Sequence, residues 1–230
     1  MKRILVILIL ALFVLSGCVP VPPVPIDRVV MLELFVAPAC GRCPPAKEAA
    51  EQLQAEYDGD FIVLEAYAWS YPLSSWSNQE ISARYSNYSG SGCPDAYFDG
   101  TNYILHYNPN DLDYYSKYKN AINIELAKET KWSIEANVDI SNIIRIEGYV
   151  EGEGIAQVGA AIIEDNVPLY SSFVDCVVRD YLTPVTINSE GEFVLIASSN
   201  DLKLVQDMSN VRVIVFLEKD QEILQSKEVI

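Results

Sequence analysis

The feature that most constrains the fold is a pair of cysteines between an apolar run and a helical pattern. The run covers residues 29–36, Cys40-Gly41-Arg42-Cys43 follows, and small and apolar residues then recur at helical spacing over 44–53. The unpaired N–H groups and the positive dipole end of a helix lower the pKa of a thiol at its N-terminus. Because the thiolate is the nucleophile in disulfide exchange, this arrangement favours redox chemistry.

The N-terminus has the pattern of an export signal. Lys2-Arg3 precedes twelve apolar residues (4–15), which are too few to cross a bilayer as a permanent helix. The next residues complete Leu15-Ser16-Gly17-Cys18, which resembles the lipobox of bacterial lipoproteins. This resemblance implies that residues 1–17 are a signal peptide and that Cys18 is lipidated. The alternative is an ordinary signal peptide followed by an incidental cysteine.

Charge narrows the possible partners. The chain of 230 residues has 16 basic and 32 acidic side chains, a net charge of −16. Without a basic stripe, no nucleic-acid partner is expected. The acidic balance also favours membrane attachment by a lipid over attraction to anionic headgroups. Export places the cysteines where disulfides can persist.

Composition and periodicity divide the chain into segments. Residues 18–28 form a lipidated, Pro-rich linker with extended character. Strand-like and helix-like stretches then alternate, which predicts an α/β domain over 29–130. From residue 131 to 230 the apolar period is two, which predicts an all-β (immunoglobulin-like) sandwich domain.

The expected elements of the first domain are strands over 29–36 and 61–67, a helix over 77–85, and a hairpin of 96–98 with 103–105. A last helix is expected to begin after Asp111, as its cap, and to end near Lys128. In the second domain the strand candidates are 134–140, 144–150, 155–163, 173–178, 184–187, 193–197, 211–217 and 222–227.

A second motif, Gly92-Cys93-Pro94, directly precedes the predicted hairpin. The order of strand, CxxC, helix, strand, helix, X-Pro, hairpin and helix resembles the thioredoxin superfamily over about 29–128. The resemblance implies that Cys40 is the attacking thiol, that Cys43 is the resolving thiol, and that Pro94 is cis. It also implies substrate-binding roles for Gly41, Arg42, Cys93 and Pro94. No cofactor is implied.

The chain departs from that superfamily at two positions. Ala39 stands where thioredoxins have an aromatic residue before the first cysteine. Leu34 aligns with their buried acid, and Glu33 is one residue away, which points it to the opposite face of the strand. Proton transfer at Cys43 therefore lacks its usual partner unless another carboxylate reaches the site. Arg42 either favours the thiolate or is an ordinary surface arginine.

The other cysteines leave alternatives open. Three alternatives stay open for Cys93: a third redox thiol, a buried free thiol, or a disulfide partner of Cys176. Cys176 is expected to be structural or inert. A zinc ribbon needs a second CxxC pair that the chain lacks, so no metal is expected. His106 is the one histidine, and no nucleophile motif accompanies it.

The segments 177–184, 213–217 and 222–225 resemble the C-terminal half of Omp28-related outer-membrane lipoproteins. That family joins a thioredoxin-like half to a β-sandwich half. The leading hypothesis is an enzyme, a thiol–disulfide oxidoreductase tethered in the bacterial cell envelope (the outer membrane of a Gram-negative cell), which exchanges disulfides with exported proteins and a redox partner. The alternative is a non-catalytic binding or structural lipoprotein in which the 40–43 disulfide only staples the fold.

Overall fold

The structure is a computed structural model, which describes residues 26–69, 76–105, 112–141 and 143–229. The expected signal peptide, the lipidation site Cys18, the Pro-rich residues before Ile26, Asp111 and His106 lie outside the described residues. Among the described residues, no helix is long and apolar enough to span a membrane.

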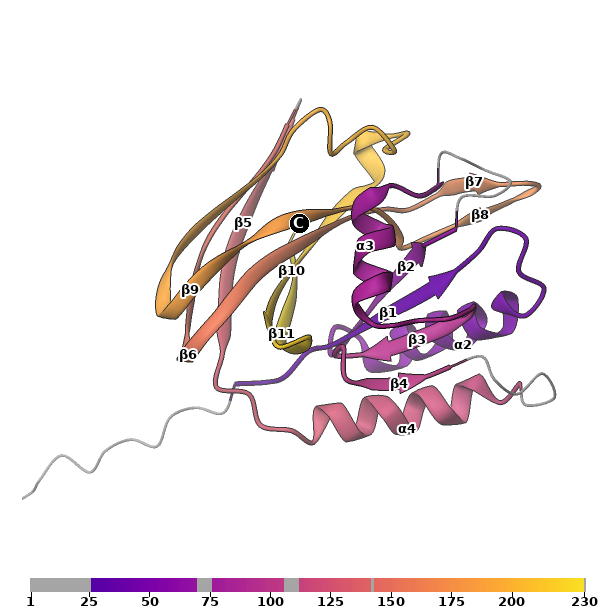
Figure 1. The fold of residues 1–230 in the computed structure, drawn as a ribbon, viewed down its shortest axis with the longest axis horizontal. Helices are drawn as coiled ribbons and strands as arrows, with labels where there is room; N and C mark the ends of the chain where they lie inside the picture. Colours follow the sequence, from indigo (N-terminus) through magenta and orange to yellow (C-terminus); the bar gives the residue numbers. More distant parts are fainter. Residues whose placement is uncertain (1–25, 70–75, 106–111, 142, 230) are drawn as a thin grey trace, which may run out of the picture.

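Strands dominate the chain, and three α-helices accompany them within the described residues (Figure 1). The first part contains β1 (Val30–Val36), α2 (Cys43–Tyr57), β2 (Phe61–Tyr67), α3 (Gln79–Asn87), β3 (Asp95–Phe98), β4 (Asn102–Ile104) and α4 (Tyr114–Leu126). The second part contains β5 (Ser133–Ile140), β6 (Ile144–Glu164), β7 (Val167–Leu169), β8 (Ser172–Val174), β9 (Val177–Ala197), β10 (Val211–Lys219) and β11 (Glu222–Val229).

Nine strands form one continuous mixed sheet. Its order is β11-β10-β6-β9-β2-β1-β3-β4, and β5 pairs with β6 beside this path. The strand β2 links the two parts, since it runs parallel to β1 and also pairs in parallel with β9 at Glu65 and Val177. β7 and β8 form a separate hairpin.

The predicted fold class, an α/β thioredoxin-like domain followed by a separate immunoglobulin-like sandwich, is therefore wrong. The chain is mostly β, and its two parts share one sheet. The reason lies in β6 and β9, which have 21 residues each and pair with one another along most of their length. Exposed polar residues and glycines near the middle of both strands predicted turns from the sequence. In the structure these residues belong to the outer part of the long, curved ribbon that β6 and β9 form together. The predicted residue limits of the segments stay predictions.

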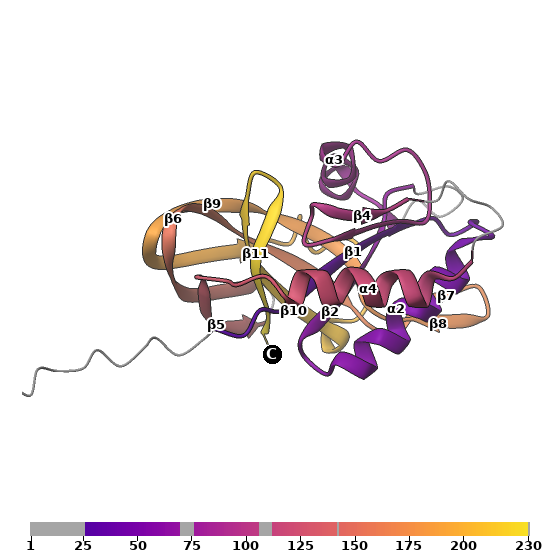
Figure 2. The same cartoon turned by 90° about the horizontal axis from the view of Figure 1, so that it is seen from below.

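The apolar cores show the same continuity. α2 and α4 cover one face of the sheet and α3 covers the other (Figure 2). The core beneath α3 combines residues from both parts, including Phe35, Ile62 and Ile81 from the first and Val178, Ile214 and Phe216 from the second. Such a shared core stabilises the two parts as one body.

Local capping explains where the helices begin. Pro44 and Pro45 occupy the first turn of α2, where proline's missing N–H costs nothing. The Asn78 side chain accepts a hydrogen bond from the Ile81 N–H at 2.8 Å, so α3 begins two residues later than predicted. α4 is capped by Asp113, whose carboxylate accepts from the Ser116 N–H.

Candidate functional site

The CxxC pair lies where β1 gives way to α2. Cys43 is the first residue of the helix, and its side chain is buried, whereas Cys40 in the preceding loop is half-buried. The two form a disulfide with 5.4 Å between their Cα atoms. Gly41 and Arg42 between them are exposed. Of the two sulfurs, that of Cys40 therefore belongs to the more accessible residue.

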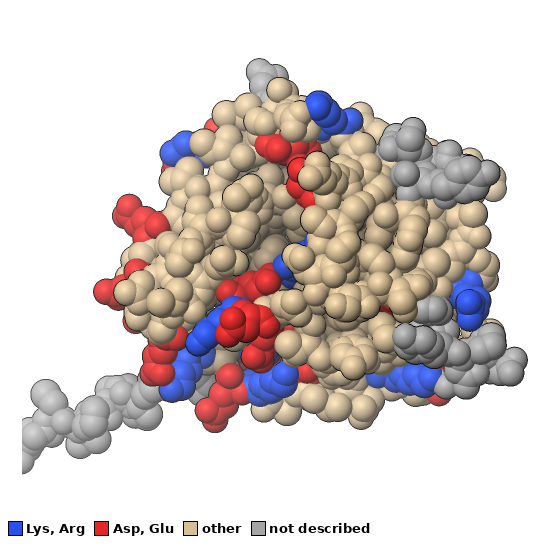
Figure 3. Space-filling model, viewed as in Figure 1, with Lys and Arg blue, Asp and Glu red and all other residues tan. Residues whose placement is uncertain are grey.

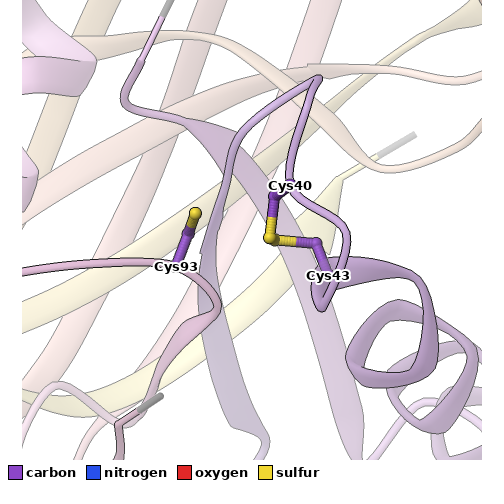
Figure 4. Close-up of side chains that lie close together, drawn as sticks. All are labelled: Cys40, Cys43 and Cys93. Carbon is purple, nitrogen blue, oxygen red and sulfur yellow. A yellow bond between two sulfur atoms is a disulfide. The ribbon is translucent and has the colours of Figure 1, made fainter. Parts of the chain in front are cut away.

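A second segment brings Cys93 to the same place. The Cys93–Pro94 peptide bond is cis, which confirms the prediction for Pro94. The sulfur atoms of Cys40, Cys43 and Cys93 lie within 4.8 Å of one another (Figure 4). Burial raises the pKa of the Cys93 thiol, Asp95 raises it further, and the charge of Arg42 lowers it. The sequence-predicted site residues thus converge, while their catalytic and substrate-binding roles stay predictions.

Cys176 lies elsewhere, and no disulfide joins it to Cys93. Its sulfur is 3.3 Å from Nη2 of Arg212 and 3.6 Å from Oε1 of Gln54. Burial raises the pKa of the Cys176 thiol to about 12, although Arg212 lowers it. A protonated, buried thiol is a poor nucleophile, and the expected structural or inert role of Cys176 stays a prediction.

A hollow of about 260 Å³ opens beside the disulfide. Residues of three segments line it: the CxxC loop and α2, Tyr67 at the end of β2, and Leu169, Ser172 and Val174 of the β7–β8 hairpin. In this hairpin, Tyr170 in the turn and Phe173 on β8 are each 70% exposed. The sequence predicted one strand over 173–178, which overlaps β8 and the start of β9, but it did not predict β7 or the hairpin, because strands of three residues lack a clear alternating pattern.

A buried carboxylate lies on the same face of the sheet as the CxxC helix. Glu65 on β2 is the register partner of Leu34 on β1, and it is 1% exposed. Its Oε2 is 2.9 Å from Nζ of Lys47, one turn after Cys43 on α2, and accepts a hydrogen bond from the Tyr67 hydroxyl at 3.3 Å. Burial raises the pKa of Glu65 to about 7, although Lys47 lowers it. Lys47 and Tyr67 both line the hollow.

Glu33 faces the other side of the sheet, as the sequence predicted. Arg84 donates to both of its carboxylate oxygens at 2.8 Å, and Tyr181 and Tyr88 also donate hydrogen bonds to it. Burial alone would raise the pKa of Glu33, but Arg84 and these hydrogen bonds hold it below its ordinary value. The carboxylate therefore stays ionised, and it serves the packing of α3 rather than the cysteines.

A second hollow, of about 280 Å³, opens on the α3 side between that helix and β6, β9 and β10. Figure 3 shows this face, hollowed between the curved strands and the rest of the molecule. Arg84 and Glu218 line it, and they form an ion pair with each other. The charge of Arg84 is thus already balanced by Glu33 and Glu218.

Comparison with known proteins gives structural neighbours. No protein-family model and no curated protein matches the chain. A protein from Agrobacterium tumefaciens, solved by a structural genomics consortium, is 17% identical and has a TM-score of 0.64; the match covers 89% of this chain and 96% of that one. A domain of the outer membrane lipoprotein Omp28 from Porphyromonas gingivalis is 12% identical, with a TM-score of 0.32, over 44% of this chain and 87% of that domain.

The Agrobacterium match shows that the fold of most of this chain is found in another protein. An Omp28 domain is among the structural neighbours, as the sequence resemblance anticipated, but the likeness is too limited to carry a functional argument.

Proposed function

We propose that the chain is a membrane-tethered, extracytoplasmic thiol–disulfide oxidoreductase that exchanges disulfides with exported proteins through Cys40 and Cys43. The observation that carries this proposal is the 40–43 disulfide at the start of α2, with its more accessible sulfur beside a hollow and a Cys93–cis-Pro94 segment alongside. The likeness of this CxxC and X-Pro arrangement to the thioredoxin superfamily supports it. The lipobox-like sequence ending at Cys18 supports export and lipid anchoring.

The exchange follows from the different exposure of the two sulfurs. A substrate thiolate attacks Cys40, which forms a mixed disulfide and releases Cys43 as a thiolate. A second substrate thiolate then attacks the substrate sulfur of the mixed disulfide and releases Cys40. The substrate gains a disulfide, and the two cysteines gain its two electrons. The reverse sequence, with Cys40 attacking and Cys43 resolving, reduces a substrate disulfide.

Glu65 supplies the buried carboxylate that Leu34 cannot. Cys43 is buried, so its thiolate needs a proton when it leaves and must lose one when it attacks. With a pKa of about 7, Glu65 can exchange a proton near neutral pH. Lys47, its ion-pair partner, lines the hollow together with Cys43 and connects the carboxylate to the site.

The test combines a reduction potential with the trapping of substrates. An active pair should have a potential above roughly −300 mV and a Cys40 pKa below the free-thiol value of about 8.5. Cys43→Ser should accumulate mixed disulfides between Cys40 and exported proteins in the cell envelope. The matched control Cys176→Ser, which changes a buried thiol outside the site, should accumulate none. A much lower potential with no trapped partner would leave the alternative, a lipoprotein whose disulfide is only a staple.

A further inference from the structure

The three sulfurs at the site form a potential metal-binding cluster. Within the described part of the chain, it is the one group of three or more cysteine, histidine or acidic side chains whose ligand atoms converge. Cys40 and Cys43 come from the loop before α2, and Cys93 comes from the segment before β3 (Figure 4). All three ligand atoms are sulfur, and the spread between them is at most 4.8 Å.

We propose that the reduced protein binds one soft monovalent cation, Cu(I), through Cys40, Cys43 and Cys93. Thiolates select soft ions such as Cu(I) over hard ions. Three sulfurs placed about 2.3 Å from an ion in a trigonal plane would lie about 4 Å from one another. The sulfurs of Cys40 and Cys43 are bonded to each other in the disulfide, so reduction must first let them separate, and the Cys93 sulfur already lies within 4.8 Å of both. Three ligands suit a trigonal Cu(I) site, whereas a structural zinc site takes four protein ligands. The sequence predicted no metal because it tested only a four-cysteine ribbon; convergence in space is what changes that conclusion.

Binding and oxidation exclude each other. The 40–43 disulfide must first accept two electrons and two protons from a dithiol reductant, which itself becomes a disulfide. The ion then replaces the thiol protons of the coordinating cysteines, because the bound form of each ligand is the thiolate. The site needs reduced thiols but no exchange with a protein substrate, so it does not rest on the proposed oxidoreductase activity.

The experiment is anaerobic titration of the reduced full chain, in detergent, with Cu(I) against a chromophoric Cu(I) chelator. Every sample carries Cys18→Ala, so that the cysteine of the lipobox adds no thiol. One Cu(I) should bind per chain and should produce a near-ultraviolet sulfur-to-copper absorption. Cys93→Ala should weaken binding by at least about tenfold, since loss of a ligand costs no less than loss of a group that only supports one. Cys176→Ala, the matched control, should leave the affinity unchanged.

Two results would overturn the proposal. One is an unchanged affinity in Cys93→Ala, which would mean that two thiols alone hold the ion. The other is failure of the reduced protein to compete with the chelator at one equivalent of Cu(I). Cys93→Ser provides a second variant, and circular dichroism shows which variants keep the fold. The protein with its disulfide intact should take up no copper, which separates this site from adventitious binding elsewhere.

Discussion

Glu65 on β2 lies directly beside Leu34 on β1, and the pairing of the two strands turns both side chains toward α2. A buried acid that faces α2 is absent from β1, where Glu33 faces the other side of the sheet, but one is present on the neighbouring strand, held by Lys47 of the CxxC helix. A carboxylate on the neighbouring strand still lies beneath the same helix, because neighbouring strands are only about 4.8 Å apart.

Glu65→Gln should change how stability depends on pH. The pKa of Glu65 is raised from 4.5 to about 7, so the folded state binds this proton more tightly than the unfolded state. The resulting stabilisation is complete below the unfolded pKa and is lost as the pH rises through about 7. Between about pH 5 and pH 8, the wild-type protein should lose up to about 3 kcal/mol more of its free energy of unfolding than Glu65→Gln does.

Urea denaturation at the two pH values measures this difference, and Glu48→Gln, which changes an exposed glutamate of α2, should follow the wild type. Parallel losses of stability in the wild type and Glu65→Gln would show that Glu65 is not the titrating group. The rate of disulfide exchange in the wild-type protein should show an inflection near pH 7, and Glu65→Gln should remove that inflection.

The aromatic tip of the β7–β8 hairpin should matter for protein substrates and not for small ones. Tyr170 and Phe173 are exposed on the hairpin whose Leu169, Ser172 and Val174 line the hollow beside the disulfide, and exposed apolar groups near a site mark contact surfaces. Tyr170→Ser with Phe173→Ser should raise KM for a reduced, unfolded protein by about tenfold, on the scale of two lost aromatic contacts. The rate with a small dithiol should stay the same. Ile196→Ser, at a half-exposed residue of β9, is the control. An equal rise in KM for this control would contradict a docking role, and so would a lower rate of the double variant with the small dithiol.

Gly100 should stabilise the contact between the β3–β4 turn and the β10–β11 turn. Its φ is +76°, and a Cβ there would come within 1.9 Å of the carbonyl oxygen of Gln221 in the β10–β11 turn. Gly100→Ala combines a strained backbone with an overpacked contact, and should lower the free energy of unfolding by about 2–4 kcal/mol.

Gly154 provides the matched comparison. Its φ is +90°, and a Cβ there would meet no atom within 4 Å. Gly154→Ala therefore carries only the backbone cost, about 1–2 kcal/mol. Chemical denaturation of both variants tests the difference, and equal losses would mean that the contact with Gln221 contributes nothing.

Several elements could be predicted from local sequence. The apolar run of β1, the buried run of β2 and the prolines that begin α2 act over a few residues. β1 and β2 lie within one residue of their predictions, and α2 begins within one residue of its prediction but runs four residues further, to Tyr57. The orientation of Glu33 away from the cysteines also followed from the alternation along one strand.

The positions of Glu65 and the β7–β8 hairpin could not be predicted in the same way. Glu65 reaches the CxxC helix through the register of two strands, and the hairpin reaches the hollow because β6 and β9 carry it there. These relationships depend on pairing between residues far apart in the chain, which no periodicity records.

By itself, the sequence determined the two cysteines at a helix N-terminus and most of the strands and helices, because these depend on residues close together in the chain. The cis bond before Pro94 followed from the resemblance in the order of elements. Only the tertiary structure decided that the strands form one sheet rather than two domains, that the buried carboxylate of Glu65 lies beside Leu34, and that Cys93 meets the disulfide while Cys176 does not. The physical reason is that strand pairing and core packing are chosen by the total burial of apolar surface and polar groups across the whole chain.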